Sequence, residues 1–533
     1  MSDRTKGAFV AGGAVSRRDL LKAAGGAALC SLVPSLAVGA QAPDFRSSRG
    51  RGLIFVVGDG MPLGVVRAMH EISTGVYGNA GSILYRRMRD EHSVLGYVGT
   101  RSLSSIVTDS APASVAWATG SKTMNRMLSS LPDGRPLKTI MELVKEEGYA
   151  CGLVTTARVT HATPAAWISH RMHRDSEEEI ALDYLKFRPD VLLGGGSSYF
   201  SAAKRKDGRD LFKEFGDSGY AVVQDRGSLL EQGTVLSKGP LMGAFTASHI
   251  SYYVDRVHGG EGEKAQPSLA EMTAVALQRL SAHPRGFLLQ VEAGRIDHAN
   301  HSNDAWASIL ETYEMDMTLG VIEAYLKANP STLVIVISDH GNAGWGLNGT
   351  GPEYSDSGDA LKKYASVRAS FETMIRRMRG KSAGEIRDIF EESTACRISH
   401  EEASMMYDAL QPGYKPYPGD YAYQPDATMG KILAHSAYGA DARGRKTALV
   451  RRGNVGFTSS NHTGEDQMVL AFGHTAHQTG LGRCVENTYL FTVLCSYFGI
   501  KYKNPSLSYD EAKQYLKTVS AGEWERHLRL HIA

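Results

Sequence analysis

The chain has 533 residues, of which 42% are hydrophobic and 22% charged, and its formal net charge is +2. This length exceeds one small domain, and the composition is that of a globular protein with a large core. A net charge so close to zero does not suggest binding to nucleic acid or to an anionic membrane surface, so neither class is expected.

Residues 1–42 have the pattern of an export signal. Arg17 and Arg18 precede a weakly apolar run at residues 23–36, and small residues follow at 40–42. A basic segment, a short apolar run and an Ala-x-Ala site predict a cleaved signal, and the paired arginines predict the twin-arginine type. A short amphipathic first helix is the alternative. We therefore expect a periplasmic or secreted protein.

The remaining chain, residues 43–533, is expected to contain no membrane span, because no apolar stretch is long enough. Its four cysteines are Cys151, Cys396, Cys484 and Cys495. Their spacing matches neither a zinc ribbon nor a disulfide scaffold, and it leaves their pairing open.

The first predicted strand, residues 53–57, ends at Gly58-Asp59-Gly60. Ligands bind at the carboxyl ends of strands in open α/β sheets, so Asp59 is a candidate metal ligand. Asp-Gly is also a common turn, which is the structural alternative. Farther on, Ser110 stands just before Pro112 at a predicted helix start, where backbone N–H groups favour an anion. The alternative there is a simple N-cap.

A second strand at residues 151–155 leads to His161 and Thr163, again on the expected ligand side of a sheet. Arg171 and Arg174 follow, and either guanidinium could bind phosphate oxygens through two hydrogen bonds. A solvated helix face is the alternative for these arginines.

The densest group of candidate ligands follows a strand predicted at residues 287–291. Glu292 comes directly after this strand, and Asp297 and His301 are four residues apart, hence on one face of a helix. Carboxylate and imidazole together suit zinc, and a carboxylate such as Glu292 also suits magnesium. A polar turn after the strand is the alternative.

Two more motifs of this kind occur later in the chain. Asp339 and His340 directly follow an apolar strand at residues 332–338, and His462 precedes another at 468–473. Between them, residues 345–455 carry charged helical segments, expected at 361–379, 383–392 and 401–410, and a Tyr/Pro/Gly-rich stretch. We interpret this region as an inserted cap beside the site, and residues 484–499 as a closing helix.

Apolar strands alternate with helices along the chain, which predicts an α/β fold with a doubly wound, mostly parallel sheet and helices on both faces. Such a sheet would bring the candidate residues to one edge. They lie in the motifs VVGDGM, TDSAPASVAWATGSKT, THATPAAWISHRMHR, VEAGRIDHANH, ISDHGN and NHTGED. In their order and sequence these motifs resemble the alkaline phosphatase family, and the resemblance extends from Ile54 to about Gly499.

The resemblance implies a hydrolase of phosphate monoesters with two zinc ions and one magnesium ion. Ser110 would be the nucleophile that becomes phosphorylated, and Arg174 would bind phosphate, with Arg171 as the alternative. The ligands implied are Asp297, His301 and His462 for one zinc, Asp59, Asp339 and His340 for the other, and Asp59, Thr163 and Glu292 for magnesium, with His161 beside them.

The chain departs from the best-known bacterial members at two positions, where His161 replaces Asp and His298 replaces Lys. These departures leave the identity of the third ion open. A phosphodiesterase or sulfatase of the same superfamily is the alternative function, although those relatives usually have Thr or a modified Cys or Ser as nucleophile. A non-catalytic metal- and phosphate-binding protein is a third possibility. Family members are often homodimers, which we carry over only as an analogy.

Overall fold

The computed structural model of the chain describes residues 45, 50–234, 239–411, 426–434, 439–440, 446–447 and 453–516. The predicted signal at residues 1–42 and the Tyr/Pro/Gly-rich stretch at 412–425 lie outside these residues. Among the described helices, none combines the length and apolar character that crossing a membrane requires.

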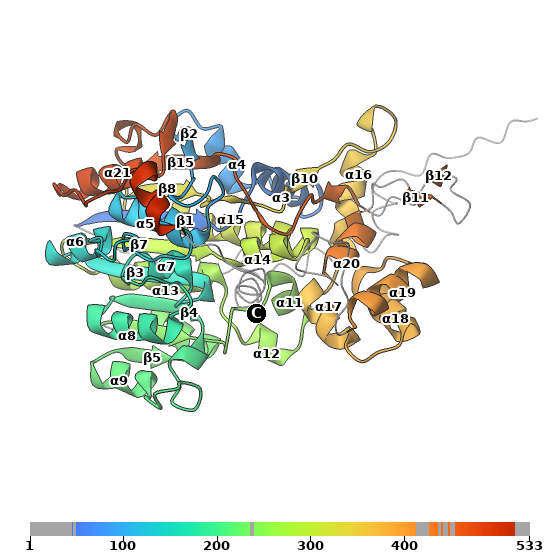
Figure 1. Ribbon diagram of the computed structural model, residues 1–533, viewed down its shortest axis with the longest axis horizontal. Helices are drawn as coiled ribbons and strands as arrows, with labels where there is room; N and C mark the ends of the chain where they lie inside the picture. The colour runs from blue at the N-terminus through green and yellow to red at the C-terminus, as the bar shows by residue number, and fades with distance from the viewer. Residues whose placement is uncertain are drawn as a thin grey trace, which may run out of the picture. The chain divides into compact units, whose positions relative to one another are not determined.

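A ten-stranded sheet forms the centre of the fold (Figure 1). Its strands are β1 (Arg51–Gly58), β2 (Val94–Gly99), β3 (Ala150–Arg158), β4 (Val191–Gly195), β5 (Ala221–Val223), β6 (Leu241–Ala244), β7 (Gly286–Ala293), β8 (Leu333–Ile337), β15 (Gln467–Gly473) and β16 (Cys484–Glu486). Their order across the sheet is β16-β2-β15-β8-β1-β7-β3-β4-β6-β5. Paired strands are parallel except at β15, which runs antiparallel to both β8 and β2. The predicted mostly parallel sheet is confirmed.

Strand β1 shows why the sheet is covered on both faces. Ile54 and Val56 belong to one apolar core, whereas Leu53, Phe55 and Val57 alternate with them into a second core. The first core includes α3 (Leu63–Gly75), α13 (Leu269–Leu280) and α15 (Ala305–Ala328), and the second includes α5 (Ser110–Thr119), α6 (Ile140–Glu146) and α21 (Tyr489–Phe498). Because side chains alternate along a strand, an uninterrupted apolar run needs apolar partners on both faces.

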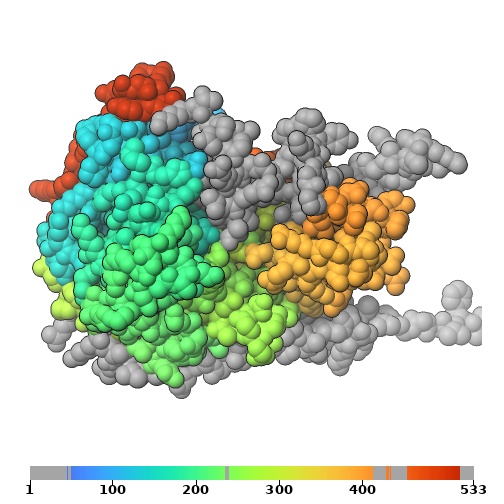
Figure 2. Space-filling view, turned by 60° about the horizontal axis from the view of Figure 1, so that its bottom comes forward, coloured from blue at the N-terminus to red at the C-terminus, as the bar shows by residue number. Residues whose placement is uncertain are grey.

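The region predicted as a cap contains a group of mostly short helices. They are α16 (Ser357–Lys362), α17 (Phe371–Met378), α18 (Ala383–Thr394), α19 (His400–Ala409) and α20 (Asp426–Ala434). Figure 2 shows much of this segment in orange beside the yellow-green surface of α12 (Glu261–Lys264), where Arg376 lies 3.8 Å from Glu263.

Two expectations about helices are wrong. The helix expected at 361–379 is interrupted, because Ser370 begins a new helix by accepting a hydrogen bond from the Thr373 N–H at 3.1 Å. The helix expected at 484–499 begins only at Tyr489, because residues Cys484–Glu486 pair with β2 at the edge of the sheet.

Candidate active site

The carboxyl ends of three adjacent strands bring acidic side chains together. In the register of the sheet, Val57 pairs with Glu292 on β7 and with Ile337 on β8. Asp59 lies two residues beyond Val57, and Asp339 lies two residues beyond Ile337. Both aspartates are fully buried, as is Glu292. Open α/β sheets bind their ligands at this edge.

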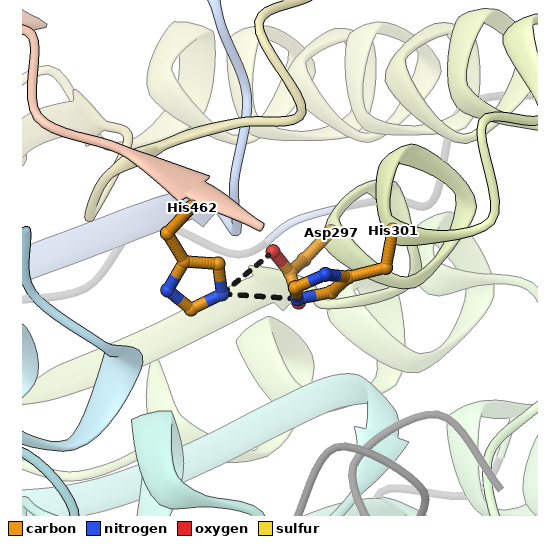
Figure 3. A group of neighbouring side chains, drawn as sticks. All are labelled: Asp297, His301 and His462. Atoms are coloured by element: carbon orange, nitrogen blue, oxygen red, sulfur yellow. Dashed lines mark hydrogen bonds and ion pairs between the residues drawn. The ribbon is translucent and has the colours of Figure 1, made fainter. Parts of the chain in front are cut away.

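The first cluster consists of Asp297, His301 and His462 (Figure 3). Asp297 and His301 share one face of α14 (Arg295–His301), as their spacing predicts, and His462 comes from β14 (His462–Thr463). His301 Nε2 lies 3.3 Å from Asp297 Oδ2 and 3.0 Å from His462 Nε2. His462 Nε2 lies 3.5 Å from Asp297 Oδ1.

The Nδ1 atoms of His301 and His462, which point away from the cluster, make contacts that show which ring nitrogen carries the proton. His301 Nδ1 lies 2.6 Å from the Ser460 carbonyl oxygen, and His462 Nδ1 lies 2.9 Å from that of Thr108. A carbonyl can only accept, so each Nδ1 donates and each Nε2 presents a lone pair to the cluster. Two facing lone pairs and a carboxylate form a donor set that suits zinc.

The second cluster consists of Asp59, Asp339 and His340, all fully buried. His340 Nε2 lies 3.1 Å from Asp339 Oδ2 and 3.7 Å from Asp59 Oδ1. Both of these carboxylate oxygens lack a hydrogen-bond partner among the described residues. Buried acceptors without a donor are costly, and a divalent cation would satisfy them.

The third cluster consists of Asp59, His161 and Glu292. The Thr163 hydroxyl donates to Asp59 Oδ2 at 3.4 Å, and the Thr155 hydroxyl donates to Glu292 Oε2 at 2.5 Å. Glu292 Oε1 is buried and has no hydrogen-bond partner in the described part of the chain. An oxygen-rich group of this kind suits a hard cation such as magnesium.

The electrostatics of the clusters differ. Burial, followed by the charge of Asp339, raises the pKa of Asp59 well above its usual value. Burial likewise raises the pKa of Glu292 to about 7. Burial also opposes ionisation of Asp297, but His301 and His462 outweigh it and hold the pKa of Asp297 well below its usual value. Asp59 lies among other carboxylates, so it is the ligand whose ionised form most needs added positive charge.

Ser110 is the first residue of α5. Its Oγ is 3.2 Å from His340 Nε2, and the residue is 1% exposed. The N-cap of this helix is Asp109, whose side chain accepts from the Ala111 N–H at 2.8 Å. The alternative that Ser110 caps its own helix is therefore wrong, and its hydroxyl faces the second cluster.

The two candidate arginines have different surroundings. Arg174 is 3% exposed, and its guanidinium lies 3.3 Å from Asp109 Oδ1 and 2.9 Å from His161 Nε2. Arg171 instead pairs with Asp183 at 2.5 Å, in a partly exposed contact. Arg174 is thus the arginine that contacts Asp109, the residue directly before Ser110.

Asp109 is a site residue that the sequence motifs did not single out. Besides capping α5, it accepts from the Arg126 N–H at 2.7 Å and contacts the Arg174 guanidinium. Its position directly before Ser110 at a helix start is the available sequence signal, since Asp is a preferred N-cap. The contact with Arg174 spans 65 residues and could not be seen in the sequence.

A model of the alkaline phosphatase family matches residues 50–499. The chain belongs to the alkaline phosphatase family. Alkaline phosphatase 4 of Bacillus subtilis is 28% identical over 437 residues, which cover 79% of this chain and 84% of that protein. Streptomycin-6-phosphate phosphatase of Streptomyces griseus is 32% identical over 362 residues, which cover 60% of this chain and 79% of that protein.

Among solved structures, the alkaline phosphatase of Thermus thermophilus superposes with a TM-score of 0.79 at 35% identity. The match covers 90% of this chain and 98% of that one. The predicted family, fold and enzyme class are therefore confirmed, and the chain is a phosphatase. Alkaline phosphatases are metal-dependent, and the three clusters are the described groups that could hold metal ions.

Proposed function

We propose that this alkaline phosphatase hydrolyses phosphate monoesters to an alcohol and inorganic phosphate through a phosphoserine at Ser110. The observation that carries the proposal is the position of Ser110 Oγ, which lies 3.2 Å from His340 Nε2 at the N-terminus of a helix. A nucleophile beside a cation-binding group and a fixed guanidinium is the arrangement that phosphoryl transfer needs.

The donor sets indicate which ions each cluster would hold. The first and second clusters combine imidazole with carboxylate and would each bind zinc. The third cluster, together with the Thr163 hydroxyl, would bind magnesium, and its member His161 would contribute an imidazole. When bound, such ions would supply positive charge that lowers the pKa of the serine hydroxyl and stabilises the departing alkoxide.

The protein's own groups orient the reaction. Ser110 Oγ gives up its proton and attacks phosphorus, an Oγ–P bond forms, and the P–O bond to the alcohol breaks as the leaving oxygen takes up a proton. Water then attacks the phosphoserine and loses a proton, the Oγ–P bond breaks, and Oγ is protonated again as phosphate leaves. The two inversions give net retention at phosphorus. Asp109 and His161 hold Arg174 where its N–H groups can donate to two phosphoryl oxygens. The positive end of α5 also favours the phosphate.

The test compares p-nitrophenyl phosphate with bis-p-nitrophenyl phosphate at alkaline pH, using zinc- and magnesium-loaded protein. We expect strong turnover of the monoester that is lost in Ser110→Ala and after chelation. A preference for the diester would support the phosphodiesterase alternative and argue against the role of Arg174. Absence of turnover with metal fully bound would leave the non-catalytic binding protein.

We also propose that residues 1–42 direct export by the twin-arginine route to the periplasm or the medium, and that the mature protein is a homodimer. The support is the Arg17-Arg18 pattern for the first and the family analogy for the second. Replacing both arginines by lysine should retain the precursor in the cytoplasm, and light scattering of the mature protein would give its mass.

A further inference from the structure

An ion pair joins the predicted cap to α14, the helix that carries Asp297 and His301. Glu372, in the first turn of α17, lies 2.6 Å from the Nη2 atom of Arg295, which begins α14. Arg295 is 2% exposed, and its guanidinium stacks 3.8 Å above the ring of Tyr252. Arg295 is therefore fixed by the cap on one side and by an aromatic ring on its face.

The backbone around Glu372 is itself anchored to the core by two buried carboxylates. Asp255 accepts from the Ser370 N–H at 2.9 Å and from the Ser370 hydroxyl at 2.6 Å. Asp304, the N-cap of α15, accepts from the Phe371 N–H at 2.7 Å. These contacts hold the start of α17 in place, so the position of the Glu372 carboxylate is set before it meets Arg295.

Arg295 in turn determines the state of His298. Its Nη1 lies 2.9 Å from His298 Nδ1. A guanidinium can only donate, so Nδ1 accepts and the proton of the neutral ring is on Nε2. This tautomer makes His298 a hydrogen-bond donor inside the site rather than a metal ligand through Nε2.

The Nε2–H group of His298 lies buried in the site. His298 is fully buried, and its Nε2 has no hydrogen-bond partner among the described residues. Its ring lies edge-on to His161 with centroids 5.5 Å apart, and His161 contacts the Arg174 guanidinium at 2.9 Å. A buried N–H without an acceptor requires an oxygen from outside the chain, either from an anion or from water.

We propose that Glu372 and Arg295 are positioning residues through which the cap holds His298 as an N–H donor and so strengthens phosphate binding at the site. The inference rests on the proposed function, because it takes phosphate as the anion that occupies the site. The inference gives the cap a role in phosphate binding, which the family motifs do not.

The test uses Glu372→Ala, with Glu392→Ala as matched control. Glu392 belongs to the same cap and pairs with Arg377 at 2.5 Å, so its variant loses the same charge without removing the contact with Arg295. Nitrogen-15 spectra of histidine-labelled protein report the tautomer, and His298→Gln identifies the His298 signal by its loss. Calorimetric titration of metal-loaded protein with inorganic phosphate reports affinity without turnover.

We expect His298 of the wild type and of Glu392→Ala to carry its proton on Nε2, and Glu372→Ala to contain both tautomers. Loss of one hydrogen bond should weaken phosphate binding about three- to tenfold in Glu372→Ala only. Glu372→Gln, which keeps an acceptor oxygen, should fall between the two, and it replaces Glu372→Ala if that variant does not fold.

An unchanged tautomer in the Glu372 variants, or unchanged phosphate affinity, would overturn the proposal. Failure of the proposed function looks different, because the wild type itself would then turn over no phosphate monoester. Even if the protein turns over no phosphate monoester, the tautomer of His298 still shows whether the Glu372–Arg295 contact acts on it.

Discussion

Gly60 stands where the first and second clusters meet, and replacing it by alanine should separate them. Its N–H donates to Asp339 Oδ1 at 2.9 Å, and its carbonyl accepts from Asn300 Nδ2 at 2.8 Å. A Cβ atom at this position would lie 2.4 Å from Asp297 Oδ1 and 2.9 Å from Asp297 Cβ. Its φ of +56° is also unfavourable for any residue with a side chain.

Both effects can be given a size. The left-handed backbone costs alanine about 1–2 kcal/mol. Relieving the contact requires Asp297 to move by at least about 0.6 Å, because carbon and oxygen atoms do not approach so closely. A shift of this order in a metal ligand is expected to lower kcat/KM on the order of 100-fold. The two effects are separable, since only the second concerns the metal site.

Gly208→Ala is the matched control. Gly208 has a φ of +68°, and a Cβ atom there would meet nothing within 4 Å. Gly208→Ala should therefore lose about 1–2 kcal/mol of unfolding free energy in urea, and Gly60→Ala should lose at least as much. Only Gly60→Ala should also lose zinc, measured by elemental analysis, and activity on p-nitrophenyl phosphate. If Gly60→Ala retains both at the level of Gly208→Ala, the placement of Asp297 against Gly60 is wrong.

Three further outcomes follow from the contacts of single groups. Arg174→Lys should lower kcat/KM about 100-fold, because two charge-assisted hydrogen bonds are lost, whereas Arg171→Lys should change it little; equal effects would contradict the assignment. Chelation should lower the melting temperature and abolish turnover, and zinc with magnesium should restore both, since the buried carboxylates repel one another without cations; an unchanged melting temperature would argue against ions at the clusters. Burial raises the pKa of Asp316 to about 6, so its folded form holds a proton more tightly than the unfolded chain. This contribution is present below pH 4 and is lost as pH rises through 6. Urea unfolding of metal-free wild type should therefore show about 2 kcal/mol more decline between pH 4 and 7 than Asp316→Asn, and parallel curves would refute it.

Most candidate ligands could be found in the sequence because each has a local signal. Asp59, Asp339 and His340 directly follow apolar runs long enough to be strands, and Asp297 and His301 have helical spacing. Parallel strands place their carboxyl ends at one edge, so an approximate meeting point also follows. What such signals lack is any measure of distance between the groups.

The features that sequence reasoning missed depend on contacts across the fold. Asp109 acts on Arg174 from 65 residues away, and Glu372 meets Arg295 across 77 residues. The short strand at Cys484–Glu486 forms the edge of the sheet by pairing with β2, and its sequence alone resembled the start of a helix. Local propensity could not reveal that tertiary preference.

The most direct test of the account is to look for phosphate on Ser110. Metal-loaded protein would be incubated with p-nitrophenyl phosphate, quenched in acid, digested and mapped by mass spectrometry. We predict one phosphate group on the peptide containing Ser110, absent in Ser110→Ala and in chelated protein. Turnover without any phosphorylated Ser110, or a phosphate group on another residue, would contradict the proposed mechanism.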